Sequence, residues 1–118
     1  MTIENTKAQM RKGVLELCVL SIISQEDAYP SDIINKLKEA KLIVVEGTLY
    51  PLLSRLKNAD LLNYEWKESS SGPPRKYYSL TDEGKSFLSD LRDTWKELNA
   101  AVSNATKKQS TQTQKSAE

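Results

Sequence analysis

The amino-acid sequence predicts a mainly α-helical protein with a small β-hairpin, an α+β fold that ends in one long helix. Three patterns lead to this prediction. Leucines recur at helical spacing between residues 49 and 56, apolar and polar residues alternate between residues 61 and 67, and a heptad repeat follows residue 81. Because the patterns occur in this order, we expect helices, then a hairpin, then a long helix.

The length and the charged fraction of the chain indicate a single globular domain. With 118 residues, 28% of them charged, the chain has enough residues for one modest core. No run approaches the roughly 20 apolar residues that cross a bilayer. The first residues, MTIENTKAQMRKG, lack the organisation of a secretory signal. We therefore expect a cytoplasmic protein with no membrane partner.

The residue types that most enzymes need are scarce. Histidine is absent and Cys18 is the single cysteine, which excludes Ser-His and Cys-His pairs and histidine–metal sites. The four glycines form no phosphate-binding loop. We therefore expect no enzyme, no catalytic residues, no metal and no cofactor. Cys18 is expected to be a small buried hydrophobe; the alternative, a redox-sensing thiol, needs exposure and a nearby positive charge.

Two helices are predicted in the first part of the chain. The first runs from about Thr6 to Ser24 and has a wide apolar face, which indicates burial on more than one side. A break follows at Gln25–Tyr29, and Pro30 suits the first turn of the second helix, where its missing N–H is not needed. The run Leu42–Val45 is mostly β-branched and is either a short strand or an extended link.

The third helix has the sharpest pattern in the first half of the chain. Four leucines form one narrow stripe, and they are Leu49, Leu52, Leu53 and Leu56. Pro51 requires the helix to begin near Gly47 or Thr48, because a proline deeper in a helix costs about 3 kcal/mol. The opposite face carries small or hydrogen-bonding residues, so we expect this helix to pack on one side and to present the other.

The next segment is predicted to be a hairpin. Its strands are Leu61–Lys67 and Arg75–Leu80, joined by a Ser/Gly/Pro loop at Glu68–Pro74. Along the first strand Leu62, Tyr64 and Trp66 alternate with polar residues. We therefore expect Trp66 to pack inward with the other two.

A long helix follows the hairpin and is expected to reach about Lys108. Thr81 is expected to cap its first turn, where carboxylates favour the helix dipole, and Gly84 stands where a capping-box glutamate would be. The heptad seam needs a partner surface. We therefore expect a dimer interface formed by Leu88, Leu91, Trp95, Leu98 and Val102.

Together these elements predict a winged helix-turn-helix with a long C-terminal dimerisation helix. A helix pair followed by a two-stranded wing presents the third helix to the DNA major groove. We therefore divide the chain into a DNA-binding domain at 1–80, a dimerisation helix at 81–108 and a disordered polar tail at 109–118. The expected partners are double-stranded DNA and a second copy of the chain.

Eight residues are candidates for DNA contact. Hydroxyl groups and a guanidinium on the third helix can bond phosphates or base edges, and a basic pair in the hairpin can reach the negative backbone or minor groove. A solvated helix face is the alternative. Because the formal net charge is only +1, DNA binding has to rest on such local groups. The candidates are Thr48, Tyr50, Pro51, Ser54, Arg55, Arg75, Lys76 and the weaker Lys36.

Two long motifs stand out: GTLYPLLxRL from Gly47 to Leu56, and GPPRKYYxLTxxG from Gly72 to Gly84. The chain resembles, in these motifs, the PadR family of bacterial transcriptional regulators. The resemblance implies a winged helix-turn-helix homodimer, usually a repressor, whose third helix reads the major groove. Two departures are Lys57, where the family often has a glutamate, and Asn58-Ala59-Asp60, where a glycine usually closes the helix.

Trp95 raises the question of an effector. A single C-terminal helix resembles the smaller PadR subfamily, which includes regulators that sense drugs or flat aromatic compounds. That resemblance implies a stacking surface at Trp95 for a small planar aromatic effector; the alternative is a tryptophan packed in the dimer core. For the whole protein, the competing hypothesis is a winged-helix protein–protein interaction module without specific DNA binding.

Overall fold

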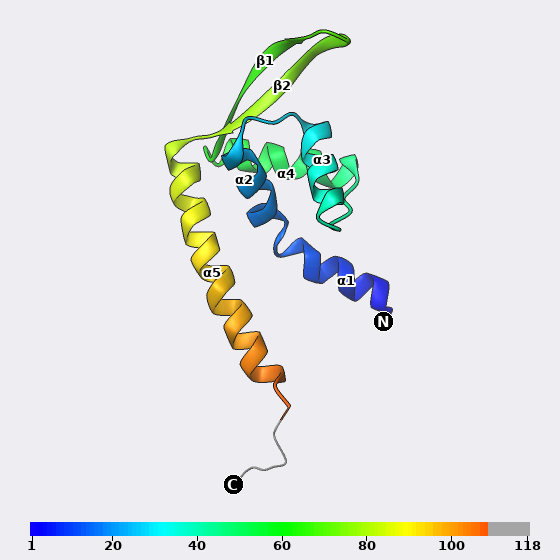
Figure 1. Cartoon of the computed structure of the whole chain (residues 1–118), viewed down its shortest axis with the longest axis vertical. Helices are drawn as coiled ribbons and strands as arrows, with labels where there is room; N and C mark the ends of the chain where they lie inside the picture. Colours follow the sequence, from blue (N-terminus) through cyan, green and yellow to red (C-terminus); the bar gives the residue numbers. More distant parts are fainter. Residues whose placement is uncertain (109–118) are drawn as a thin grey trace.

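The computed structural model describes residues 1–108. Four helices come first: α1 (Ile3–Lys12), α2 (Leu15–Gln25), α3 (Pro30–Glu39) and α4 (Glu46–Asn58). The hairpin β1 (Leu62–Ser69) and β2 (Gly72–Leu80) follows, and then α5 (Asp82–Thr106) (Figure 1). The predicted fold class and element order are confirmed, with one helix more than expected. The predicted tail, 109–118, lies outside the described residues.

The helix predicted from Thr6 to Ser24 is in fact two helices. The backbone turns at Gly13 and Val14, where the Val14 N–H donates to the Arg11 carbonyl (3.0 Å). Glycine is a poor helix former, and the two segments have different surroundings: α2 is part of the core, whereas α1 has no buried residue. Met10, which matched the apolar pattern, is therefore 73% exposed.

The core lies between α2, α3, α4 and the first turns of α5. The four leucines predicted as a stripe on α4 are all buried there. Leu42–Val45 is an extended link rather than a strand, with Val44 buried. No helix within residues 1–108 is long and apolar enough to span a membrane.

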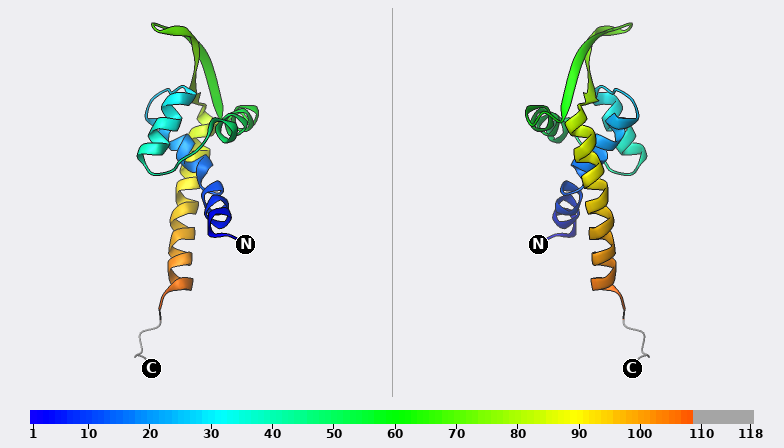
Figure 2. Two further views of the ribbon diagram at one scale, coloured as in Figure 1. Left: turned by 90° about the vertical axis from the view of Figure 1, so that its right-hand side faces the viewer. Right: turned by 90° about the vertical axis from the view of Figure 1, so that its left-hand side faces the viewer.

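The hairpin is longer than its sequence pattern predicted. Its antiparallel register pairs Leu62 with Leu80 and continues past an irregularity after Lys67 to the pair Ser69–Gly72, so the turn is shorter than the predicted loop. Beyond its base the hairpin projects away from the helices (Figure 2). Ala28 holds the base by exchanging two backbone hydrogen bonds with Tyr78, of 3.2 and 2.8 Å.

Trp66 does not pack inward as predicted. Leu62, at the base of β1, is buried, but Tyr64 is 37% and Trp66 63% exposed, so the prediction holds for Leu62 alone. At Trp66 the hairpin has passed the hydrophobic core, so the ring faces a hollow at the starts of α3 and α4 instead of buried side chains. The period-two pattern therefore located the face of the strand but not the point at which the core ends.

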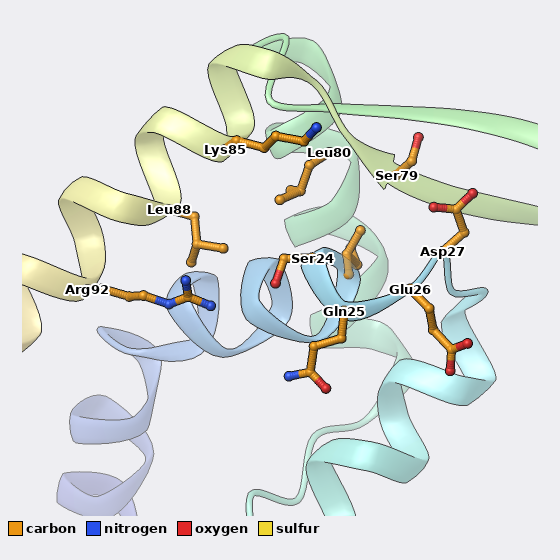
Figure 3. A pocket seen from close by; sticks show the side chains of 10 residues that line it. Ser24, Gln25, Glu26, Asp27, Ser79, Leu80, Lys85, Leu88 and Arg92 are labelled. Carbon is orange, nitrogen blue, oxygen red and sulfur yellow. The ribbon is translucent and has the colours of Figure 1, made fainter.

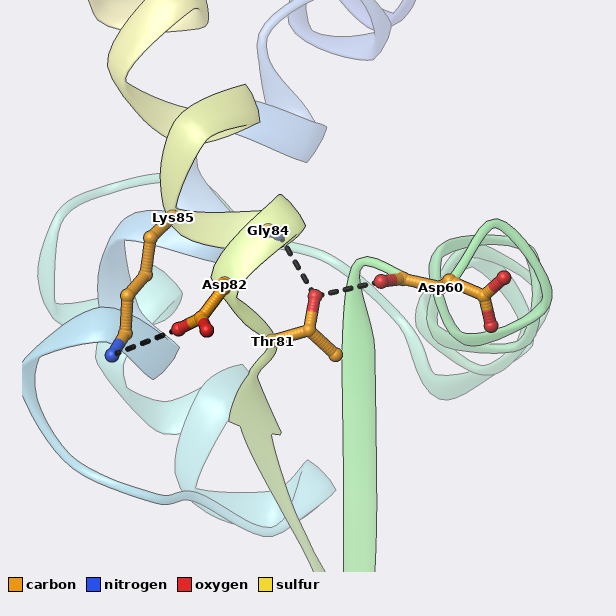
Figure 4. A network of polar contacts seen from close by, with 5 residues as sticks. All are labelled: Asp60, Thr81, Asp82, Gly84 and Lys85. Carbon is orange, nitrogen blue, oxygen red and sulfur yellow. Dashed lines mark hydrogen bonds and ion pairs between the residues drawn. The ribbon is translucent and has the colours of Figure 1, made fainter.

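A tight backbone junction joins α4, the hairpin and α5 (Figure 4). The Thr81 hydroxyl donates to the Asp60 carbonyl (2.6 Å) and accepts from the Gly84 N–H (2.9 Å), which confirms the predicted cap. The Thr81 N–H donates to the Leu61 carbonyl (3.1 Å). These bonds tie the start of α5 to the start of β1, so α5 and the wing have one defined relative position.

Helix α4 ends in a motif that usually contains glycine. Asp60 has a φ of 63°, its N–H donates to the Lys57 carbonyl, and the Leu61 N–H donates to the Leu56 carbonyl, both at 3.0 Å. This is the Schellman pattern, in which the left-handed residue carries a steric penalty unless it is glycine. The segment Asn58-Ala59-Asp60, which stands where the family usually has a glycine, therefore holds Asp60 in the left-handed conformation.

We expect Asp60→Gly to stabilise the protein by about 0.5–1 kcal/mol. Glycine relieves the steric strain of the left-handed conformation, and its greater conformational entropy in the unfolded state offsets part of that gain. The backbone bond from Thr81 to residue 60 is retained. Urea unfolding followed by circular dichroism measures the change. Asp60→Ala is the control, because alanine keeps the Cβ; a gain as large as that of glycine would contradict the explanation.

Candidate nucleic-acid interface

The outer face of α4 presents the predicted residues to solvent. Thr48, Tyr50, Pro51, Ser54 and Arg55 are all exposed, while the leucines of the same helix are buried. The exposed groups of these five residues are hydroxyls, a pyrrolidine ring and a guanidinium, and the one carboxylate of α4, that of Glu46, is exposed in the first turn. Such a face can approach a polyanion closely and form hydrogen bonds to it.

Arg55 and Lys57 point from α4 toward different neighbours. Arg55 Nη2 lies 3.5 Å from Glu16 Oε1 of α2, and the Arg55 side chain is 63% exposed. Exposed ion pairs of this kind contribute about 0–1 kcal/mol, so the guanidinium can leave Glu16 at small cost. The Lys57 ammonium instead lies 5.8 Å from the ring centroid of Tyr64 in the wing.

Arg75 and Lys76, the predicted basic pair, contact different aromatic rings because the side chains of neighbouring strand residues start in different directions. The Arg75 guanidinium stacks over Tyr29 at 4.3 Å from the ring centroid. Tyr29 in turn makes an edge contact with Tyr77 at 5.2 Å between centroids. Arg75 is thereby attached to the start of α3, which fixes the wing relative to the helix pair.

The Lys76 ammonium lies 4.3 Å from the Tyr64 ring centroid and 5.5 Å from that of Trp66. Tyr64 and Trp66 meet edge to face at 6.4 Å. Cation–π contacts at exposed sites contribute about 0.5–1 kcal/mol each, so they order these cations without removing their charge. The sequence analysis did not include Tyr64 or Trp66 among the candidate residues; the one signal in the sequence was their spacing to Lys76 across the hairpin.

Arg75, Lys76 and Trp66 line a hollow of about 330 Å³, which we call the wing pocket. It lies where the wing meets the starts of α3 and α4, and it brings together three predicted residues, Tyr50, Arg75 and Lys76. The charged side chains that line it are both cations. The lining residues are Tyr29, Pro30, Ser31, Tyr50, Trp66, Pro74, Arg75 and Lys76.

The remaining predicted contacts lie outside the wing pocket. Thr48 lines a separate hollow of about 390 Å³ together with Arg11 and Lys12. Lys36 is exposed on α3 and lines none of these hollows. Arg11 and Lys12 therefore place two cations beside Thr48, near the start of α4.

Another hollow, of about 470 Å³, lies between the end of α2, β2 and α5 (Figure 3). Its charged lining residues carry both signs: Glu26 and Asp27 on one side, Lys85 and Arg92 on the other. Arg92 also donates to the Ser21 hydroxyl at 3.2 Å. This mixed lining offers no uniformly positive surface and differs in that respect from the wing pocket.

The heptad seam of α5 divides into a buried and an exposed part. Leu88 is 3% exposed and belongs to the core of its own chain, so its assignment to the dimer interface is wrong: a side chain already covered by its own chain has no surface left for a second copy. Leu91 is half-buried against the same core. Trp95, Leu98 and Val102 remain exposed.

The exposed seam and α1 face one apolar hollow of about 470 Å³. Met10 and Val14 line it from one side, and Trp95, Leu98 and Val102 from the other. The sequence analysis did not include Met10 and Val14 among the interface residues. They appeared to belong to the predicted first helix, whose break at Gly13 directs them toward α5.

Cys18 is half-buried and packs against the core, as expected for a small hydrophobe. Burial raises the pKa of its thiol above the usual value. A redox-sensing cysteine needs the opposite shift, because the thiolate is the reactive form. Within residues 1–108 no group of three or more His, Cys, Asp or Glu side chains is arranged to hold a metal ion.

The helix pair α3–α4 followed by the wing defines a winged helix-turn-helix protein, with one face of α4 free beside the wing. Residues 19–90 match the model of the PadR-like family of transcriptional regulators. The chain belongs to this family and is a PadR-like transcriptional regulator.

Solved structures of relatives agree with this assignment. A PadR-like transcription factor from Bacteroides fragilis is 65% identical, with 86% of this chain and 99% of that chain covered and a TM-score of 0.72. A PadR-like regulator from Bacillus cereus is 41% identical over 86% and 99% of the two chains, with a TM-score of 0.76. Bacillus subtilis PadR in complex with operator DNA is 25% identical over 66% of this chain and 45% of its own, with a TM-score of 0.61.

Proposed function

We propose that this protein is a repressor that binds palindromic operator DNA as a homodimer, with α4 in the major groove and the wing on the flanking backbone. The observation that carries the proposal is the outer face of α4, where Thr48, Tyr50, Pro51, Ser54 and Arg55 are exposed, beside a wing that holds two ordered cations, Arg75 and Lys76. Bacillus subtilis PadR, a relative of the same fold, is known in complex with operator DNA, which supports the choice of partner.

Selection of bound duplexes from a random pool tests the proposal. We expect a palindromic consensus whose half-sites lie one helical turn, about 34–36 Å, apart. Affinity for the selected duplex should fall steeply as salt rises, because cations on the protein release counterions from DNA. Failure to enrich any duplex, or affinity independent of salt, would instead favour the protein–protein interaction module.

The ion pair between Arg55 and Glu16 gives a specific prediction for DNA binding. Glu16→Gln should raise operator affinity about two- to fivefold, because Arg55 no longer has to leave a carboxylate that contributes up to about 1 kcal/mol. Fluorescence anisotropy with a labelled duplex at fixed salt measures the change. Glu97→Gln, on the exposed distal part of α5, is the matched control. A weaker complex in Glu16→Gln would mean that Glu16 orients Arg55 instead of competing for it.

The homodimer is proposed from two apolar surfaces that the chain itself leaves uncovered. Helix α1 has no buried residue although Ile3 and Met10 lie on it. The distal part of α5 exposes Trp95, Leu98 and Val102 at heptad spacing. A second copy related by two-fold symmetry can cover both surfaces, since the same patch occurs on each subunit.

Leu98→Asp is expected to convert the dimer into monomers and to lower operator affinity at least tenfold, because a carboxylate in the seam loses its water without gaining a partner. Sedimentation velocity and duplex binding report the two effects. Ala100→Asp introduces the same charge on the opposite side of α5, where the residue is exposed, and should change neither. A Leu98→Asp protein that remains a dimer would place the interface elsewhere.

We further propose that a small planar aromatic effector binds at Trp95 and releases the operator. The apolar hollow between α1 and α5, of about 470 Å³, supports a ligand of this class. In a Trp66→Phe variant Trp95 is the single tryptophan, so its fluorescence can be titrated with planar aromatic compounds. Quenching that accompanies operator release supports the effector; no response across a broad panel would make Trp95 a packing residue of the dimer.

A further inference from the structure

The wing carries a tryptophan whose position folding alone does not explain. Trp66 is 63% exposed, yet an indole ring contributes to stability mainly through the large area it buries, about 150–250 Å². Its aromatic and cation–π contacts are the edge of Tyr64 and the Lys76 ammonium. Most of the ring therefore remains available to a partner.

The surroundings of Trp66 define the chemistry of that partner. Trp66 lines the wing pocket with Arg75 and Lys76, and no carboxylate lines it. The remaining polar groups in the lining are hydroxyls, from Tyr29, Ser31 and Tyr50. Two cations and several hydroxyl donors fit an anion, and the exposed indole fits an apolar group next to that anion. A phosphodiester joined to a deoxyribose ring has both features.

The pocket is also continuous with the outer face of α4. Tyr50 belongs both to that face and to the pocket lining, so a duplex whose major groove holds α4 passes its backbone along the pocket. The charge of the lining is complementary to this backbone.

We infer that the wing pocket binds one phosphodiester of the DNA backbone and that Trp66 packs against the adjoining deoxyribose. Arg75 and Lys76 neutralise the phosphate, and the Tyr50 hydroxyl donates a hydrogen bond to it. The inference rests on the proposed DNA binding and adds a contact residue to it. Because every nucleotide has the same backbone, this contact is independent of base sequence.

The test uses the full-length protein and two duplexes of equal length, the selected operator and a scrambled sequence. Trp66→Ala is expected to weaken binding about tenfold to both duplexes, and Trp66→Phe less than threefold, since phenylalanine keeps an apolar ring. Phe87→Ala is the matched control, an exposed aromatic residue on α5 outside the pocket. Thermal unfolding of each variant verifies that the wing is folded.

A second measurement needs no substitution at the interface. In protein labelled with 5-fluorotryptophan, the two tryptophans give two fluorine NMR signals, assigned with the Trp66→Phe variant. The Trp66 signal should shift when either duplex is added.

The outcomes separate this inference from the proposed function. Wild-type protein that binds neither duplex would overturn the proposed function and the inference with it. Intact operator binding in Trp66→Ala, or an unshifted Trp66 signal in the complex, overturns the inference alone. A loss confined to the operator duplex would also overturn it, because Trp66 would then respond to sequence and not to the common backbone.

Discussion

Replacing Gly84 with alanine is expected to destabilise the protein by about 3 kcal/mol, the upper part of the usual range for overpacking. A Cβ at residue 84 would lie 2.1 Å from the Leu61 carbonyl oxygen and 3.1 Å from its carbon. Both atoms are backbone, and that carbonyl accepts the hydrogen bond of the Thr81 N–H. The clash therefore cannot be relieved by a side-chain rotation and has to separate α5 from β1.

The direction of this effect is opposite to that of an ordinary helix substitution. Alanine normally stabilises a helix relative to glycine by about 0.5–1 kcal/mol. Denaturant unfolding of Gly84→Ala, followed by circular dichroism, measures the loss. Gly13→Ala is the control, because a Cβ there meets one backbone atom at 3.9 Å, and it should be neutral or slightly stabilising. Equal stability of Gly84→Ala and wild type would contradict the close approach.

Ser54→Glu is expected to reduce operator affinity at least 100-fold without loss of stability. Ser54 is exposed on the outer face of α4, so a longer side chain is tolerated in the free protein. In the proposed complex its carboxylate would face phosphates and acceptor groups of bases. Like charges brought together at an interface cost several kcal/mol, and a loss of about 3 kcal/mol in binding free energy corresponds to a reduction in affinity of about 100-fold.

The measurement is anisotropy of a labelled operator duplex at constant salt, together with thermal unfolding. Ser89→Glu makes the same change at an exposed position of α5 and should retain affinity. Ser54→Ala separates charge from the loss of a hydroxyl, with an expected reduction below tenfold. Wild-type affinity in Ser54→Glu would exclude the outer face of α4 from the interface.

Local patterns in the sequence predicted most of the secondary structure. The leucine stripe of α4, the strand β1 and the Thr81 cap each depend on residues a few positions apart, and all three are present in the structure. The two motifs also pointed to the correct family. The eight proposed DNA-contact residues came from the same patterns, and their role is a matter for the experiments above.

Some features depend on segments that meet only in the folded chain. The exposure of Trp66 depends on where the hairpin leaves the helices, and the burial of Leu88 depends on the packing of α5 against the core. Neither property is encoded in a periodicity, because a period gives the direction of a side chain and not what lies opposite it.

The long C-terminal helix that ends the predicted fold illustrates the same division. Spacing and capping chemistry within this one segment predict that the helix exists, where its cap lies and which side is apolar. How that apolar side is shared between the core and the surface follows from the packing of α5 in the folded chain. The first turns are covered by the chain's own core, whereas Trp95, Leu98 and Val102 lie beyond it. Burial depends on contacts between distant segments, and no local pattern contains those contacts.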